Sequence, residues 1–228
     1  MPIFDLAITP LRDINQTLHD VAQGANDLHY DIVNPRGSHA VAAGVHAPIT
    51  IDVQGNVGYY CGGMNEDATI TIHGSAGPGV GENMMSGTIV VKGDASQYAG
   101  ATACGGLLVI EGNASSRCGI SMKGVDIVVR GNIGHMSAFM AQAGNLVVLG
   151  DAGDALGDSL YEARIFVRGK VKSLGADCIA KEMKPKHLKI VADLLEKAGV
   201  TDVRPEEFSR YGSARKLYTF HVDNADAY

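Results

Sequence analysis

Short runs of alternating hydrophobic and polar residues recur along the chain at a constant interval of 19 residues. In each run, the residues four and two positions before a glycine are Ile, Leu or Val, and the residue directly before that glycine is usually polar. Alternation with a period of two is typical of a β-strand that buries one side and exposes the other. The seven glycines that close these runs, called marker glycines below, are Gly55, Gly74, Gly93, Gly112, Gly131, Gly150 and Gly169.

A second small residue follows each marker glycine after seven positions, which predicts a second corner in every repeat. Repeats of this length indicate a solenoid, in which each unit buries its hydrophobic side only when its neighbours stack on it. The sequence therefore predicts a mainly β fold, a parallel β-helix of about seven 19-residue coils that occupies residues 48–180. The predicted corners are Gly62, Gly81, Gly100, Gly119, Ala138, Gly157 and Ala176.

The segment before the repeats, residues 1–47, is predicted to be an N-terminal helix and capping segment. Hydrophobic residues at helical spacing follow Pro10 and stop at Gly24, so we expect a helix with Thr9 as its N-cap and Pro10 in its first turn. Residues 29–33 are expected to be extended. This segment would cover one open end of the solenoid, where unpaired strand edges favour aggregation.

The segment after the repeats, residues 181–228, is predicted to be a C-terminal helical cap and an extended tail. A second, shorter helix is expected at Pro205, and residues 216–220 alternate as a strand does. Aromatic residues in this tail predict packing of the cap or docking on a partner. The helical stripe that ends at Gly199 consists of Leu188, Val191, Leu194 and Leu195.

Charge and composition exclude several classes of protein. The net charge of −6 disfavours a nucleic-acid partner, because such proteins usually present a basic surface. Neither a membrane-spanning stretch nor a signal peptide is recognisable, which predicts a cytoplasmic protein without a membrane partner. The four cysteines lack the close spacing of zinc or iron–sulfur ligands, so buried reduced thiols are expected.

Motifs that carry chemistry are weak in this sequence. The glycine-rich segment 74–81 resembles a phosphate-binding loop, but no Lys-Ser/Thr pair follows and its outer glycines are repeat positions. The eight histidines are scattered, and their spacing does not predict a zinc or iron site. We therefore predict no catalytic, cofactor-binding or metal-ligating residue in this chain.

Known enzymatic β-helices also fit poorly. Sugar-cleaving β-helices stack carboxylates on one outer face, whereas the position before the marker glycines is chemically mixed. Left-handed acyltransferases repeat every six residues, and 19 is not divisible by six. A self-sufficient enzyme, with a site in a groove between the coils and the C-terminal helices, remains the alternative.

The repeat as a whole resembles the C-terminal GXGXG domain of glutamate synthase. The resemblance covers about residues 31–180 and rests on the turn Asn34-Pro35-Arg36-Gly37 and on the glycine corners, most clearly in segment 74–81. In that family the domain is a right-handed parallel β-helix that supplies no catalytic side chain. The length of the chain and the tail around residues 210–218 are similar to the small subunit of N-methylglutamate synthase, also called methylamine–glutamate N-methyltransferase. GlxC-type proteins fit nearly as well.

This resemblance implies a non-catalytic scaffold subunit in a hetero-oligomer. Its partners would be an amidotransferase-like subunit and a synthase-like subunit that carries FMN and an iron–sulfur cluster, while this chain binds no cofactor. Residue 2 is Pro2, where the amidotransferase needs a cysteine nucleophile, so that activity would belong to another chain. A more distant alternative is the β-helix subunit of formylmethanofuran dehydrogenase.

Overall fold

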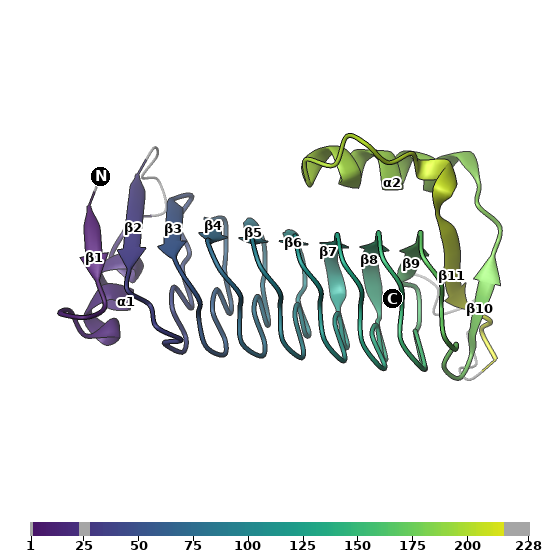
Figure 1. The fold of residues 1–228 in the computed structure, drawn as a ribbon, viewed down its shortest axis with the longest axis horizontal. Coiled ribbons are helices and arrows are strands. Elements are labelled where there is room, and N and C mark those ends of the chain that lie inside the picture. The colour runs from purple at the N-terminus through teal and green to yellow at the C-terminus, as the bar shows by residue number, and fades with distance from the viewer. Residues whose placement is uncertain (1, 23–27, 217–228) are drawn as a thin grey trace.

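The protein is described by a computed structural model that covers residues 2–22 and 28–216. Strands β1 to β9 run parallel along a column, and β11 and β10 complete the sheet in the order β9-β11-β10 (Figure 1). The predicted parallel β-helix is confirmed. The strands are β1 (Ile3–Asp5), β2 (His29–Val33), β3 (Thr50–Gln54), β4 (Thr69–Ile72), β5 (Thr88–Val91), β6 (Leu107–Ile110), β7 (Lys123–Val129), β8 (Ala143–Val148), β9 (Arg164–Val167), β10 (Cys178–Lys181) and β11 (Ser209–Ser213).

Equivalent residues of successive coils pair directly, so that Ile51 lies beside Ile70 and Ile70 beside Ile89. All the hydrophobic residues predicted to point inward are fully buried. Each of them removes a side chain from water, which stabilises the column by about 1.5–3 kcal/mol per residue before the entropy cost of folding. These residues are Ile51, Val53, Ile70, Ile72, Ile89, Val91, Leu108, Ile110, Ile127, Val129, Leu146, Val148, Ile165 and Val167.

The column begins earlier than the 19-residue interval indicates. Strand β2 pairs in register with β3, with Tyr30 opposite Ile51, and β1 pairs in turn with β2. The offset between Tyr30 and Ile51 is larger than 19 residues, so an exact repeat does not reveal it. Part of the predicted N-terminal cap is therefore a further coil.

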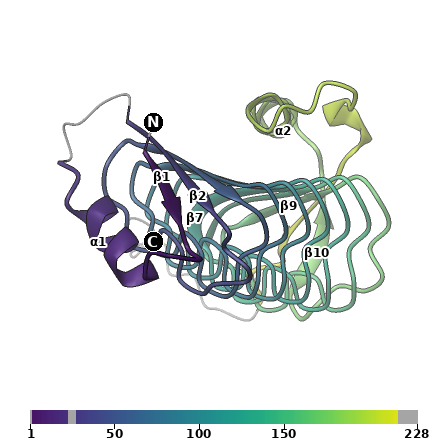
Figure 2. The same cartoon turned by 60° about the vertical axis from the view of Figure 1, so that its left-hand side comes forward.

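Helix α1 (Leu11–His19) lies beside the N-terminal coils, as Figure 2 shows, and buries Ile14 and Leu18 in the main core. Its N-cap is Pro10, without a side-chain hydrogen bond, so the prediction that Thr9 caps the helix is wrong. The helix also ends before the predicted stop at Gly24, a residue outside the described part of the chain.

Close approach between backbones, not backbone conformation, explains six of the seven marker glycines, all but Gly55. A Cβ atom at Gly150 would lie 2.6 Å from the carbonyl oxygen of Gly131, inside van der Waals contact. The amide of Gly150 donates to that same oxygen at 3.1 Å, which joins the two coils. Among the marker glycines, Gly55 has a positive φ, of 135°, and no other does. A side chain at most of these positions would push neighbouring coils apart.

The residue after each marker glycine forms a ladder of side-chain hydrogen bonds. Asn113 accepts the amide of Asn132 at 2.9 Å through its Oδ1, and Asn132 accepts the amide of Asp151 at 2.7 Å. A short side-chain acceptor therefore satisfies a backbone donor that the turn leaves without a main-chain partner. The acceptors in this ladder are Asn56, Ser75, Asp94, Asn113, Asn132 and Asp151.

The residue at the predicted second corner has a positive φ. The position requires a small residue because a side chain there would point into the core, not because of the positive φ. Gly100 and Ala138 share this position, with φ of 66° and 57°. Tyr98 and Thr102, on either side, also have positive φ, of 64° and 54°, although they carry large side chains. In the last coil the pairing shifts to an 18-residue offset, Leu156 with Leu174, so Ala176 does not occupy the predicted corner.

Helix α2 (Pro185–Lys197) covers a flank of the column rather than its open end (Figure 1). It packs on the outward residues of β7, β8 and β9. The open end is instead closed by β11, which pairs antiparallel with β9, and by β10 beyond it. The short helix expected at Pro205 is a 3₁₀ turn, Pro205–Glu207. The second core consists of Val128, Val147, Phe166, Val191, Leu194, Leu195, Val200 and Phe208.

The last described residues are tied to the column by side-chain contacts. Ser213 donates through its hydroxyl to Asp177 at 2.6 Å, and Arg215 forms an ion pair with Glu162 at 2.7 Å. The expected extended segment 216–220 lies outside the described residues apart from Lys216.

Alanine substitutions should distinguish two reasons for glycine at the second corners: the left-handed backbone conformation and the lack of space for a side chain in the core. A Cβ atom at Gly100 would lie 2.6 Å from Cδ1 of the buried Ile127, whereas at Gly119 it would lie 3.3 Å from that atom. We expect Gly119→Ala to cost about 1 kcal/mol of unfolding free energy for the left-handed conformation. Gly100→Ala should cost about 1–3 kcal/mol more because it overpacks the core. Thermal unfolding followed by circular dichroism measures the difference, and equal losses would contradict the assignment.

Truncation of Phe166 should release α2 without opening the column. The side chain is fully buried under the helix, and its loss should cost about 3–5 kcal/mol locally. Hydrogen exchange should then rise in α2 while β3 to β6 stay protected. Val90→Ala, in the equivalent outward position away from α2, is the matched control and should change neither region. Uniform loss of protection would contradict a separately docked helix.

Candidate functional site

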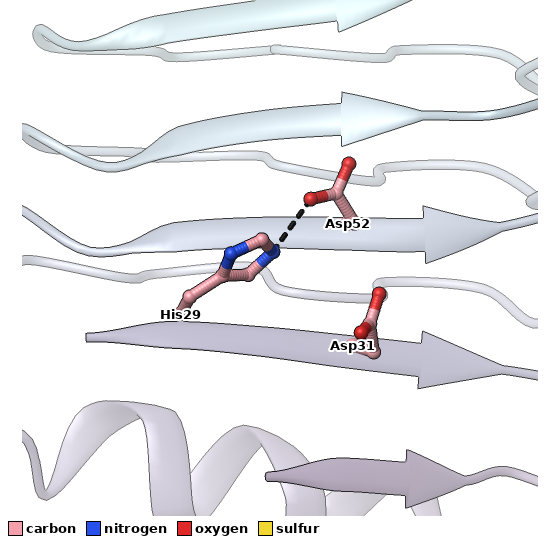
Figure 3. Close-up of side chains that lie close together, drawn as sticks. All are labelled: His29, Asp31 and Asp52. Atoms are coloured by element: carbon pink, nitrogen blue, oxygen red, sulfur yellow. Dashed lines mark hydrogen bonds and ion pairs between the residues drawn. The ribbon is translucent and has the colours of Figure 1, made fainter. Parts of the chain in front are cut away.

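The outer face of the sheet changes character along the column. Over β7 to β9 it is hydrophobic and covered by α2, whereas over β2 to β4 it is polar. Charged side chains gather at that polar end, where His29 and Asp31 lie on β2 and Asp52 lies on β3 (Figure 3). His73, directly after β4, completes this group, called the His–Asp cluster below.

Asp52 lies between two imidazoles. Nε2 of His29 is 2.6 Å from Oδ2 of Asp52, and Nε2 of His73 is 2.6 Å from Oδ1 of the same carboxylate. Because an ionised carboxylate only accepts hydrogen bonds, both imidazoles donate through Nε2. The side chain of Asp52 is 19% exposed. Both of its oxygens are therefore held in a fixed direction.

The register of the sheet places Asp31 directly beside Asp52 on the neighbouring strand. Gln54 donates to Oδ1 of Asp31 at 3.0 Å, which orients this second carboxylate. Like charges at directly opposite positions destabilise a sheet. The cluster consequently concentrates negative charge. Among the described residues, this charge is offset by the imidazoles of His29 and His73 and by the hydrogen bond from Gln54.

Two opposing effects act on the pKa of Asp52. Partial burial raises the pKa, but the hydrogen bonds from His73 and His29 outweigh burial and hold it below its ordinary value. The carboxylate is therefore ionised at neutral pH. An ionised carboxylate beside imidazole nitrogens is a set of donors that suits a metal ion.

A cationic cluster lies at the opposite end of the same face, at the start of α2. Arg164 and Arg210 have no acidic partner among the described residues, and Nε of Arg210 is buried without a hydrogen bond. Burial and the nearby Arg164 lower the pKa of Arg210. Burial, together with Arg210 and Lys186, also lowers the pKa of His187, so this histidine is held neutral.

A surface hollow lies between the end of α2 and the sheet. This is the region where the alternative hypothesis, a self-sufficient enzyme, would place its active site. Thr88, Leu107, Asp126 and Lys197 line the hollow. Asp126 accepts a hydrogen bond from Asn145 at 2.7 Å. Among the described residues that line this hollow there is one carboxylate and one amine, and none of them forms the pair of nucleophile and general base that covalent catalysis needs.

Three of the four cysteines offer little reactivity. Cys61, Cys118 and Cys178 are buried, and burial raises the pKa of each to about 12. Such thiols stay protonated and poorly nucleophilic. Cys104 differs from the expectation because it is exposed.

The glycine-rich segment 74–81 lies in the coil as its repeat positions predict. Gly79 and Gly81 are left-handed corner residues, with φ of 71° and 65°. The outward position before the marker glycines is mixed in charge, with Lys92 paired to Glu111 at 2.7 Å. A row of catalytic carboxylates is therefore absent from this position.

Sequence reasoning missed the convergence of His29 and His73 on Asp52. These histidines are far apart in the chain, but His29 begins β2 and His73 directly follows β4, so they flank β3 at its opposite ends. The alternating pattern of residues 29–33 could have revealed this convergence. It aligns with β3 if the first coil is taken to be longer than 19 residues. Assigning residues 29–33 to a cap concealed it.

Comparison with known proteins agrees with this architecture. The model of the GXGXG motif family matches residues 34–204, and the chain belongs to that family. It is similar over its full length to Protein GlxC of Rhizobium meliloti (strain 1021), with 74% identity over 228 residues and 100% of each chain covered. In the described parts of the chain, no helix is long and hydrophobic enough to span a membrane.

Removing one carboxylate of the cluster should stabilise the protein in the absence of metal. Asp31→Asn abolishes the repulsion with Asp52 and keeps an acceptor for Gln54, so unfolding free energy should rise by about 0.2–1 kcal/mol in buffer with a chelator. Asp151→Asn, which keeps the acceptor for the Lys170 amide, is the control and should have no effect. Chemical denaturation compares the two, and destabilisation by Asp31→Asn would contradict the repulsion.

Proposed function

We propose that this chain is a non-catalytic scaffold subunit of a glutamate synthase-like complex. The observation that supports the proposal is the packing of the column: its interior is filled with hydrophobic side chains along its whole length. Chemistry that needs an enclosed site has no space there. The long rigid exterior is instead suited to holding other proteins at fixed positions.

The distribution of reactive groups supports the same role. Three of the four cysteines are buried with raised pKa values, and the described residues that line the hollow beside α2 do not pair a nucleophile with a base. Flavin and an iron–sulfur cluster would therefore reside on a synthase-like partner, and glutamine hydrolysis on an amidotransferase-like partner. An obligate interface with each would bury about 2,000 Å² or more.

Within this class, N-methylglutamate synthase is the reaction that we favour. The resemblance of the chain to the small subunit of that enzyme supports methylamine and glutamate as substrates of the complex, with N-methylglutamate and ammonia as products. Another glutamate synthase-like complex with a GlxC-type subunit is the second candidate, and similarity to Protein GlxC favours it.

Isolation of the native chain with its companions tests this function. We expect a colourless chain when it is expressed alone, and a complex with flavin and iron–sulfur absorbance when it is recovered from its own cells. The complex, but not the chain, should form N-methylglutamate from methylamine and glutamate. A complex that is active with another amine would favour the second candidate.

A chromophore bound stoichiometrically by the isolated chain would overturn the scaffold role. Turnover by the isolated chain would do the same and would favour the groove enzyme. In that event Asp126→Asn should abolish activity, whereas Asp94→Asn, on the hydrogen-bond ladder, should leave it unchanged.

A further inference from the structure

We propose that the His–Asp cluster binds one divalent transition-metal ion of the zinc type. His29, Asp31 and Asp52 would supply the ligands, and His73 would act as a positioning residue through Asp52. The proposal concerns the chain itself and does not depend on the proposed function.

The ligand atoms are already close together. One ligand atom each of His29, Asp31 and Asp52 lies within 4.8 Å of the other two, and their side chains project from two adjacent strands (Figure 3). Ligands bound to zinc at about 2.0–2.2 Å are roughly 3–4 Å apart, so small side-chain rotations suffice. A rigid, in-register sheet fixes the backbone of all these residues.

Each ligand has a partner that orients it. His73 donates to Oδ1 of Asp52, which leaves Oδ2, now hydrogen-bonded to His29, as the oxygen facing the metal position. Gln54 holds one oxygen of Asp31 in the same way. Outer partners of this kind fix the direction of ligands in metal sites, and their loss typically weakens binding 10–100-fold.

Charge also favours a cation at this position. Asp31 and Asp52 are adjacent, and in the described chain the groups that form ion pairs with Asp52 are imidazoles rather than lysine or arginine. A metal ion would bind Nε2 of His29 in place of its proton, leaving a neutral imidazole with its proton on Nδ1 and releasing any second proton to solvent, and would neutralise both carboxylates. One imidazole with carboxylates suits first-row transition metals better than magnesium, which prefers oxygen ligands and retains its water.

The cluster is accessible to an ion from solvent. The side chain of His29 is 40% exposed and that of Asp52 is 19% exposed, so the site is open on one side and supported on the other. A water molecule would complete a tetrahedral set with the three protein ligands.

Zinc titration of the full chain, freed of metal by a chelator, tests the proposal. The protein should carry no affinity tag and should contain Cys104→Ser, because an exposed thiol is a competing ligand. Calorimetry should show one Zn²⁺ per chain and no comparable heat with Mg²⁺. Binding to several weak sites, or no saturation, would overturn the proposal.

Variants then assign the ligands. His29→Gln and Asp52→Asn should weaken zinc binding more than 100-fold, and His73→Gln should weaken it about 10–100-fold. His135→Gln, an exposed histidine outside the cluster, should leave the affinity unchanged. Circular dichroism and the melting temperature verify that each variant is folded. Wild-type affinity in folded His29→Gln or Asp52→Asn, or an equal loss in His135→Gln, would refute the site.

Cobalt provides an independent readout if a zinc-binding variant is unstable. Co²⁺ in the wild-type site should give visible bands of nitrogen and oxygen ligation without thiolate charge transfer, and His73→Gln should shift these bands. Intense thiolate bands in wild-type protein that vanish in Cys104→Ser would place the ion on the cysteine and overturn the proposal.

Discussion

The structure depends on the close stacking of equivalent backbone segments at the marker glycines. Where the amide of Gly150 donates to Gly131 at 3.1 Å, no Cβ atom fits between the coils. This contact fixes the distance between coils, and the constant distance lets equivalent residues of successive coils pair, as in β3 to β6 and in β8 with β9. Inward side chains then stack on identical positions of the next coil, so the hydrophobic core follows from the spacing of the backbone. The ladder of side-chain acceptors satisfies the donors that this tight turn leaves free.

A column built in this way places all variable chemistry on its outside. The inward positions of β3 to β9 are occupied by branched hydrophobic residues, and the second corners face inward with hydrogen or a methyl group. The outer face of the sheet therefore carries the differences between coils: α2 and its hydrophobic contacts at one end, and the His–Asp cluster at the other. A scaffold role and a metal site are compatible, because both use the exterior of the same rigid sheet.

The column also joins residues that are remote in sequence. Asp31 and Asp52 become neighbours through strand register, and His73 reaches Asp52 from the next strand along. Outward residues at equivalent positions of successive coils lie side by side. A few charged residues at equivalent positions therefore suffice to form a cluster. The same geometry brings Arg164 and Arg210 together at the other end, where β11 returns antiparallel to β9.

The sequence by itself determined the repeat, the inward residues and the parallel β-helix, because an interval of 19 residues and a period of two are local patterns. It also located α2 and three of the four residues of its predicted stripe, since Val191, Leu194 and Leu195 are buried whereas Leu188 is only partly buried. Only the tertiary structure decided that β2 belongs to the column, that Ala176 leaves its predicted corner, and that α2 lies on the flank. These features depend on offsets that differ from 19 residues and on contacts between distant segments. The His–Asp cluster depends on the sequence and on the tertiary structure. The sequence supplies its histidine and aspartate side chains, and the strand register makes them neighbours.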